Sequence, residues 1–137
     1  IERTVETEMK KLYESGENYL ETILVLFNRH GEVRSIDIVR EMELSKPSVS
    51  RAMGILKEGG FILIDENGYI TLTEDGRQVA ETIYERHRVL TDWLVSLGVD
   101  EKTAAEDACR MEHAISSTSF DRLKEHIKKY HQNIGKS

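Results

Sequence analysis

The first strong pattern along the chain is a set of apolar residues that recur every three or four positions. They are Tyr19, Leu20, Ile23, Leu24 and Phe27. This spacing places them on one face of a helix, and Gly31 follows as a stop signal. We therefore predict a helix over residues 14–30.

Two shorter amphipathic segments follow, separated by a tight break. Ser35 begins the first, which we expect to end near Leu44, and Ser45 begins the second, which we expect to end at the glycine pair 59–60. Serine is a preferred N-cap because its side-chain oxygen accepts a hydrogen bond from a backbone N–H of the first helical turn. The pattern predicts two helices joined by a turn.

The pattern changes from helical to β-type in the segment FILIDENGYITLT. Two apolar runs flank Glu66, Asn67 and Gly68, and the Asn-Gly pair is typical of hairpin turns because such turns require positive φ. Helical spacing returns after Thr73, a candidate N-cap. We predict three further helices, over residues 74–97, over residues 100–115, and from Ser119 or Asp121 to residue 130.

The order helix, helix, turn, helix, hairpin is that of a winged helix-turn-helix, in which the helix after the turn enters the major groove of DNA. We predict a mainly α fold with a small β wing. Residues 1–73 would form the winged helix-turn-helix DNA-binding domain, and residues 74–137 a second, helical domain.

Composition narrows the classes of function. The formal net charge of −6 argues against loose, charge-driven binding to nucleic acid, but residues 34–60 carry five basic side chains against four acidic ones. The longest apolar run, ILVLF, is far too short to span a membrane, and the N-terminal residues lack the apolar core of a signal peptide. We expect a cytoplasmic protein with no membrane partner.

The segment ACRMEH contains the chain's only cysteine, three residues before a glutamate and four before a histidine. On a helix this spacing places Cys109, Glu112 and His113 on one face. Thiolate, carboxylate and imidazole together are a typical ligand set for a transition metal. A single cysteine cannot form an internal disulfide. The alternative is therefore that Cys109 is simply packed in the core beside an ordinary Glu-His pair, because buried cysteines are common on amphipathic helices.

Five segments together resemble the DtxR/MntR family of metal-dependent repressors, over nearly the whole chain. ENYLETI resembles the family's first helix, DIVREMELSKPSVSRAM its helix-turn-helix, GYITLTEDGR its wing and exit, ERHRVL the middle of its long helix, and ACRMEH its principal metal motif. The resemblance is to the short members that lack the C-terminal SH3-like domain. It implies that residues 74–137 bind metal and form a dimer.

The resemblance implies six metal ligands. They are Asn18, Glu21, His87, Cys109, Glu112 and His113. Asn18 stands where the family usually has Asp or Met, and its amide oxygen is a neutral, weak ligand. The alternative for His87 is a surface histidine between two arginines.

Two positions of the longer iron regulators' ancillary site are changed in this chain. Thr91 and Ala105 stand where that site needs a carboxylate and a histidine. The resemblance then implies that His87 joins Glu112 and His113 in the paired-metal arrangement of the short members, with up to two ions per subunit.

The resemblance also implies double-stranded DNA as a partner. Family contacts cluster at the start of the recognition helix, here Pro47, Ser48, Ser50 and Arg51, and the phosphate contacts expected nearby are Arg34, Arg40 and Lys46. For each of these, solvated helix surface is the alternative. A palindromic operator requires a homodimer. The candidate dimer interface is the apolar surface of Val89, Trp93, Leu94 and Leu97 together with the helix over residues 100–115, and the alternative is that these residues form the internal core of the same domain.

We therefore expect a metal-dependent repressor of metal homeostasis genes, with Fe²⁺ favoured over Mn²⁺ as corepressor because a thiolate suits the later, softer metal. An enzyme is not expected, because the motifs include no nucleophile paired with a base and no glycine-rich phosphate loop. The alternative function is a winged-helix regulator that responds to an organic ligand or a protein partner, with no metal role.

Overall fold

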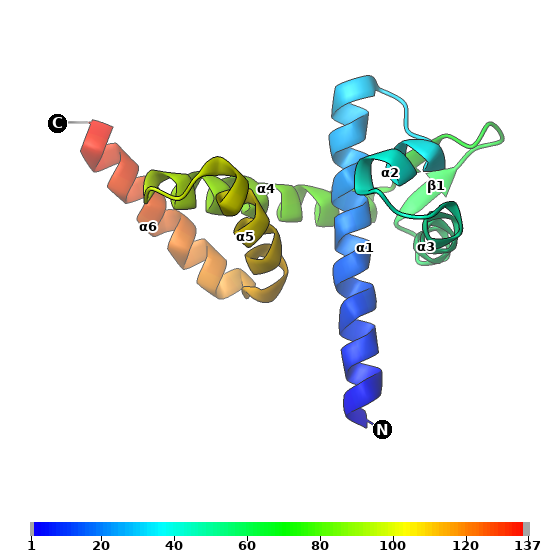
Figure 1. The fold of residues 1–137 in the computed structure, drawn as a ribbon, viewed down its shortest axis with the longest axis horizontal. Helices are drawn as coiled ribbons and strands as arrows, with labels where there is room; N and C mark the ends of the chain where they lie inside the picture. The colour runs from blue at the N-terminus through cyan, green and yellow to red at the C-terminus, as the bar shows by residue number, and fades with distance from the viewer. Residues whose placement is uncertain (1, 136–137) are drawn as a thin grey trace. The chain divides into compact units, whose positions relative to one another are not determined.

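The computed structural model describes the backbone of residues 2–135 and the side chains of residues 15–130 (Figure 1). Within that range the elements are α1 (Glu2–His30), α2 (Ser35–Met42), α3 (Lys46–Glu58), β1 (Ile62–Ile64), β2 (Ile70–Leu72), α4 (Glu74–Ser96), α5 (Glu101–Ala114) and α6 (Ser117–Gly135). The predicted fold class, mainly α with one small β hairpin, is confirmed. None of these helices has the length and apolar composition that crossing a membrane requires.

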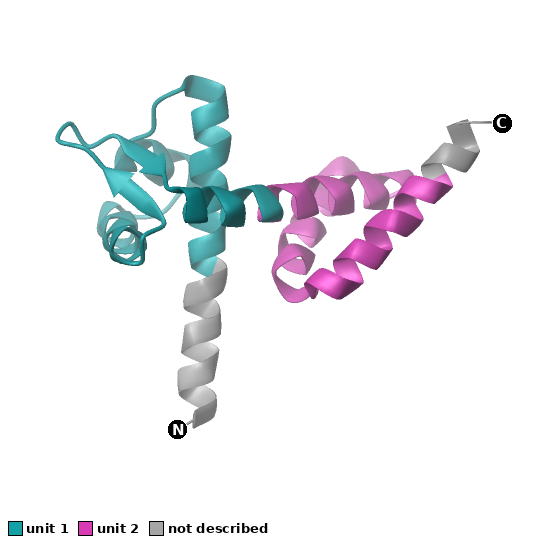
Figure 2. Ribbon diagram, turned by 180° about the vertical axis from the view of Figure 1, so that it is seen from behind, with its two compact units in different colours: residues 1–82 teal, residues 83–137 magenta. Residues whose placement is uncertain are grey.

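The chain divides into two compact units, an N-terminal unit of residues 1–82 and a C-terminal unit of residues 83–137 (Figure 2). The division falls inside α4, whereas the boundary predicted after residue 73 falls at the beginning of that helix. The domain limits 1–73 and 74–137 stay a prediction.

Three helices and the hairpin enclose the apolar core of the N-terminal unit. Its buried side chains include Leu20, Ile23 and Leu24 of α1, Ile38 of α2, Val49, Met53 and Leu56 of α3, and Ile62 and Ile70 of the hairpin. Helical periodicity predicted Leu20, Ile23 and Leu24, because residues three and four apart share one helix face, whereas Phe27 of the same predicted face is 41% exposed. The core holds α2 and α3 together as a helix-turn-helix.

The turn between α2 and α3 is formed by local hydrogen bonds. Glu43 takes a left-handed conformation with φ of 55°, and Ser45 Oγ accepts from the backbone N–H of Ser48 at 3.3 Å. Ser45 is thus the predicted N-cap of α3. The prediction for Ser35 is wrong: Arg34 is the N-cap of α2, and its backbone N–H donates to Asp37 Oδ2 at 2.8 Å.

The predicted hairpin is present, with β1 and β2 antiparallel and Ile64 opposite Ile70. Its loop, residues 65–69, is ordered by Asp65, whose Oδ1 accepts from the backbone N–H groups of Asn67 and Tyr69, both at 2.9 Å. Only Gly68 of this loop has positive φ. The backbone N–H of Ile70 also donates to the carbonyl of Val33 at 2.7 Å, which connects the hairpin to the segment before α2.

The hairpin leads directly into α4 through a crowded junction. Thr73 Oγ1 donates to the carbonyl of Gly60 at 2.6 Å and accepts from the backbone N–H of Gly76 at 3.1 Å, so Thr73 is the predicted N-cap. A Cβ on Gly76 would lie 2.0 Å from the carbonyl oxygen of Phe61, far inside contact distance. Only glycine allows α4 to approach the hairpin this closely.

The C-terminal unit packs α5 and α6 against the later part of α4. Leu90, Ala108 and Phe120 form its buried centre, with Val89, Trp93, Met111, Ile115 and Leu123 packed around them. Asp100 caps α5 as predicted, by accepting from the backbone N–H of Thr103 at 3.0 Å. The helix α6 begins two residues before the earlier of its predicted positions, because Ser116 is its N-cap and accepts from the backbone N–H of Ser119 at 3.1 Å.

The largest boundary error concerns α1, which begins at Glu2 rather than at residue 14. Residues 2–13 are rich in charged, helix-compatible residues and contain no glycine or proline. Val5, Met9 and Leu12 recur at helical spacing within this segment, a pattern that the predicted start at residue 14 overlooked.

Candidate metal centre and nucleic-acid interface

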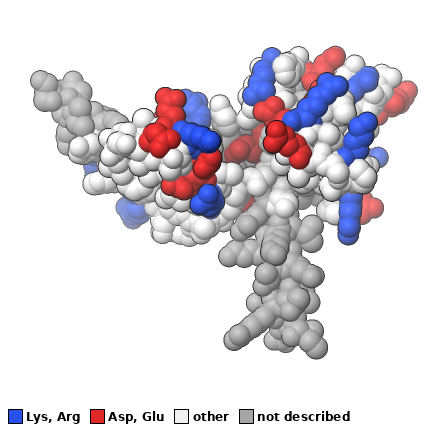
Figure 3. Space-filling view, viewed as in Figure 1, with Lys and Arg blue, Asp and Glu red and all other residues white. Residues whose placement is uncertain are grey.

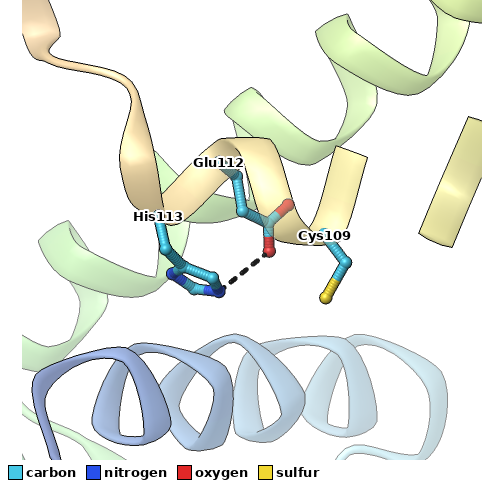
Figure 4. A group of neighbouring side chains, drawn as sticks. All are labelled: Cys109, Glu112 and His113. Carbon is cyan, nitrogen blue, oxygen red and sulfur yellow. Dashed lines mark ion pairs between the residues drawn. The ribbon is translucent and has the colours of Figure 1, made fainter. Parts of the chain in front are cut away.

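The side chains of Cys109, Glu112 and His113 project from one side of α5 (Figure 4). One ligand atom from each residue lies within 4.8 Å of the other two. Ligand atoms bound to one ion at about 2.0–2.3 Å lie at most roughly 4.6 Å apart. The three side chains therefore need only small shifts to bind a common ion.

Glu112 is the centre of this arrangement, and its side chain is fully buried. Its Oε2 lies 2.9 Å from Nδ1 of His87 on α4, and its Oε1 lies 3.4 Å from Nε2 of His113. A histidine that donates Nδ1–H to a carboxylate presents Nε2 as its lone-pair atom. The structure thus brings His87 to the triad predicted on α5.

A divalent cation fits the chemistry of this cluster. Glu112 Oε1 is buried and receives no hydrogen bond from any side chain or backbone group that the structure describes. A buried carboxylate oxygen without a donor is costly, and a cation removes that cost. Sulfur, carboxylate oxygen and imidazole nitrogen are together a transition-metal donor set, so Cys109, Glu112 and His113 are the residues that would hold the ion, with His87 in contact with Glu112.

Asn18 and Glu21 lie on α1, in the N-terminal unit, and both are half-buried. Three residues apart, they share one helix face. The backbone carbonyl of Asn18 accepts from Thr22 Oγ1 at 2.8 Å, a contact within the helix. Their roles as metal ligands stay predictions.

Arg86 is the residue that the sequence did not single out. It is 9% exposed, and its Nη1 donates to the carbonyl oxygens of Glu112 at 3.0 Å and Ile115 at 2.8 Å. In the sequence it was only a charged neighbour of His87. The one available signal was its place beside a candidate ligand, which does not predict burial.

The predicted DNA-contact residues of α3 all lie on its exposed side. Lys46, Pro47, Ser48, Ser50 and Arg51 are exposed, while the opposite side of the helix is buried in the core. The hydroxyl of Ser45 also donates to Ser48 Oγ at 2.8 Å, so the first turn of α3 is internally ordered. An ordered first turn with exposed polar groups is what a helix needs to contact base edges.

The two other predicted phosphate contacts, Arg34 and Arg40, are also exposed and belong to the same unit. Arg34 Cζ lies 4.3 Å from the centre of the Tyr69 ring, a cation–π contact between the cap of α2 and the wing. The face of the molecule in Figure 3 carries Lys and Arg interspersed with Asp and Glu. Binding to DNA would thus depend on particular side chains rather than on a uniformly basic surface.

The predicted interface set on α4 is divided by the structure. Val89 and Trp93 pack against the buried centre of the C-terminal unit, which favours the internal-core alternative for these two. Leu97 is 62% exposed, and Val95 beside it is 38% exposed. The end of α4 thus presents apolar side chains that the unit itself does not cover.

Two family descriptions match adjoining parts of the chain. Residues 11–72 match the iron dependent repressor N-terminal DNA binding domain, and residues 73–134 match the iron dependent repressor metal binding and dimerisation domain. The two matches follow the order of the winged helix-turn-helix and the helical unit.

Individual relatives agree with these matches. An uncharacterized HTH-type transcriptional regulator of Methanocaldococcus jannaschii is 31% identical over 88% of this chain and 98% of its own length. The transcriptional regulator MntR of Salmonella typhimurium is 32% identical over 77% of this chain and 67% of its own length.

Solved structures of regulators resemble the fold of this chain. The manganese regulator SloR has a TM-score of 0.74 at 27% identity, and T. acidophilum IdeR has a TM-score of 0.69 at 25% identity. Each comparison covers 82% of this chain, which spans only 53% of either solved chain. With both family descriptions matched and these relatives similar over most of its length, this chain belongs to the DtxR/MntR family of metal-dependent transcriptional repressors.

Proposed function

We propose that this protein is a homodimeric repressor of metal homeostasis genes that binds a palindromic operator only when a divalent metal occupies the cluster around Glu112. The observation that carries the proposal is the fully buried Glu112 carboxylate, which lies between His87 and His113 and has an oxygen without a hydrogen-bond donor. Such a group is poorly satisfied without a cation and well satisfied with one.

The proposed ligand set is larger than the cluster on α4 and α5. Cys109, Glu112, His113 and His87 form its centre, and the family resemblance adds Glu21 and Asn18 from α1. With ligands from both units, metal affinity would depend on the position of α1. A ligand shifts a conformational equilibrium only by its differential affinity for the two states, so the metal would favour the state in which all of its ligands can bind it. We propose up to two ions per subunit, with Glu112 shared between them.

The proposed DNA-reading surface is the exposed side of α3, with Arg51 at its centre. Arg51 would bind a guanine edge or a phosphate, and Pro47 would contact a thymine methyl group. Arg34, Arg40 and Lys46 would contact phosphates and set the register of the helix in the groove. One such helix reads a half-site, so two subunits related by two-fold symmetry are needed for a palindrome.

Fe²⁺ is the corepressor that we favour, with Mn²⁺ as the alternative. The Cys109 thiolate supports Fe²⁺, because hard Mn²⁺ prefers oxygen and nitrogen ligands. Family members that sense manganese usually have a carboxylate at this position, whereas iron-sensing members have cysteine. Glu21 is a feature of the manganese branch and supports the alternative.

The proposed function is tested by operator binding with and without metal. Duplexes selected from a random library by the metal-loaded protein would serve as the operator, and chelator-treated protein would be titrated with single divalent metals. We expect binding to require metal, while circular dichroism stays helical throughout. Equal binding by metal-free and metal-loaded protein would contradict the proposal and favour a regulator that responds to an organic ligand or a protein partner.

The identity of the metal needs a separate, anaerobic experiment. Operator binding by the native protein and by Cys109→Glu would be compared with Fe²⁺ and Mn²⁺ buffered at cellular concentrations. We expect Fe²⁺ to activate the native protein, and Cys109→Glu to shift the response toward Mn²⁺. A native protein that responds to Mn²⁺ alone would overturn the preference for iron and leave the metal-dependent function standing.

A further inference from the structure

We propose that Arg86 is a positioning residue of the metal centre: it holds the last turn of α5 so that Glu112 and His113 keep the arrangement that binds a cation. The inference rests on the proposed function, because it assigns a role toward the same metal centre. It adds a residue that is not itself a ligand.

One guanidinium group connects the end of α5 to the beginning of α6. Arg86 Nη1 donates to the carbonyls of Glu112 at 3.0 Å and Ile115 at 2.8 Å, and Nη2 donates to Ser117 Oγ at 3.1 Å. The Phe120 ring centre lies 5.4 Å from Arg86 Cζ. These contacts fix the corner between the two helices.

The end of α5 needs such a donor for a general reason. The last carbonyl groups of a helix have no partner within the helix and carry the negative end of its dipole. Arg86 is 9% exposed, and its guanidinium donates to the carbonyl oxygens of Glu112 and Ile115. Its charge is therefore balanced by helix-end carbonyls, which a planar group with several N–H donors can reach together and a lysine cannot.

The Arg86 guanidinium contacts Glu112, the residue that is central to the metal cluster. Arg86 binds the main-chain carbonyl of Glu112, and the next residue, His87, contacts the carboxylate of the same Glu112 at 2.9 Å. Two consecutive residues of α4 thus hold the backbone and the side chain of one ligand. His113 follows in the last turn of α5, which ends at Ala114, where helices otherwise fray.

Loss of the Arg86 hydrogen bonds should therefore weaken metal binding without removing a metal ligand. Arg86→Lys keeps the charge but not the fork of donors, and Ser117→Ala removes only the contact to α6. Arg88→Met is the matched control, because Arg88 is exposed and lies near the Tyr84 ring at 5.8 Å. Mn²⁺ affinity of the purified full chain would be measured by competition with a fluorescent chelator.

We expect Arg86→Lys to bind Mn²⁺ roughly 10- to 100-fold more weakly than the native chain, as for other groups that orient metal ligands. Ser117→Ala should show a smaller loss, and Arg88→Met none. Native affinity in both Arg86→Lys and Ser117→Ala would overturn the positioning role. Absence of metal binding by the native chain would instead overturn the proposed function.

A second measurement separates positioning from general stabilisation. In chelator-treated protein, amide exchange would be followed at Ile115, whose N–H donates to the carbonyl of Met111 at 3.1 Å, and at Ala108 in the middle of α5. We expect Arg86→Lys to accelerate exchange at Ile115 and not at Ala108. Equal acceleration at both amides, with unchanged Mn²⁺ affinity at a temperature where the variant is folded, would show a merely structural role. Should Arg86→Lys not fold, Ser117→Ala carries both measurements.

Discussion

The two units of this protein place their functional groups in opposite environments. In the N-terminal unit, the proposed DNA contacts on α3 are all exposed, and the buried side of that helix is apolar. In the C-terminal unit, Glu112 is completely buried and Arg86 is 9% exposed, beside a buried centre made of Leu90, Ala108 and Phe120.

In the N-terminal unit, the residues proposed to contact DNA therefore contribute little to the stability of the fold. In the C-terminal unit, the residues proposed to bind metal also affect that stability. An exposed arginine costs little to keep and little to remove, because water solvates it in the folded and unfolded states alike. A buried carboxylate loses its hydration on folding and needs compensating partners. Metal binding supplies such a partner, so the C-terminal unit should gain stability from its ligand.

The largest effect is expected from Glu112→Ala, which removes the shared buried ligand. Metal affinity should fall by more than roughly 100-fold, beyond the loss expected for groups that only orient ligands, and metal-dependent operator binding should be lost. Glu106→Ala is the control, since Glu106 is an exposed carboxylate on the same helix. Isothermal titration with Mn²⁺ and operator binding would measure both. Retained affinity in Glu112→Ala would show that the buried cluster is not the metal centre.

Metal itself should stabilise the folded protein strongly. At a free concentration 100 times the dissociation constant, a ligand that binds only the folded state contributes about 2.7 kcal/mol to the free energy of unfolding. Urea unfolding with and without Mn²⁺ would show the gain in the native chain and its loss in Glu112→Ala. The urea midpoint of the native chain would be compared under conditions where titration shows the site saturated with Mn²⁺. If Mn²⁺ left that midpoint unchanged, the expected difference between the units would be contradicted.

A smaller effect, confined to function, is expected from Arg51→Ala. Loss of a contact to a base edge or a phosphate should weaken operator binding about 10-fold, while metal affinity and the free energy of unfolding stay unchanged. Arg122→Ala on α6 is the charge-matched control, because Arg122 is exposed and its Nη1 lies 3.6 Å from the carboxylate of Glu125, also on α6. Reduced metal affinity in Arg51→Ala would contradict the separation of stability and function in the N-terminal unit.

The smallest effect is expected from Asp100, an exposed carboxylate of the C-terminal unit. It tests whether a carboxylate of this unit matters for stability because it is buried or simply because it belongs to the unit. The pKa of Asp100 lies below its usual value of 3.8, mainly because its carboxylate accepts from the backbone N–H of Thr103. A lowered pKa in the folded state adds stability above 3.8 that disappears as the pH falls through the folded value.

Asp100→Asn should remove this pH dependence and keep most of the cap, since asparagine caps helices about as well as aspartate. Thermal unfolding of the native chain and the variant on both sides of pH 3.8 would show a small difference. If Asp100→Asn changed the unfolding temperature more than Glu112→Ala does in the same measurement, burial would not be what makes a carboxylate important for stability.

Local patterns in the sequence determined most of the fold. Ser45, Thr73 and Asp100 mark helix starts because an N-cap depends on a few neighbouring backbone groups. The convergence of Cys109, Glu112 and His113 was equally predictable, since helical spacing alone places them on one face. Family resemblance, not spacing, was needed to name His87, Glu21 and Asn18.

Only the tertiary structure decided how the cluster is built, because its contacts join residues far apart in the chain. His87 and Glu112 are 25 positions apart, Arg86 and Ser117 are 31 apart, and no local periodicity encodes either contact. Glu112 is also completely buried, which its position on the helix face does not determine. Spacing along one helix identifies residues that can act together, but the solvation of a carboxylate depends on what folds around it.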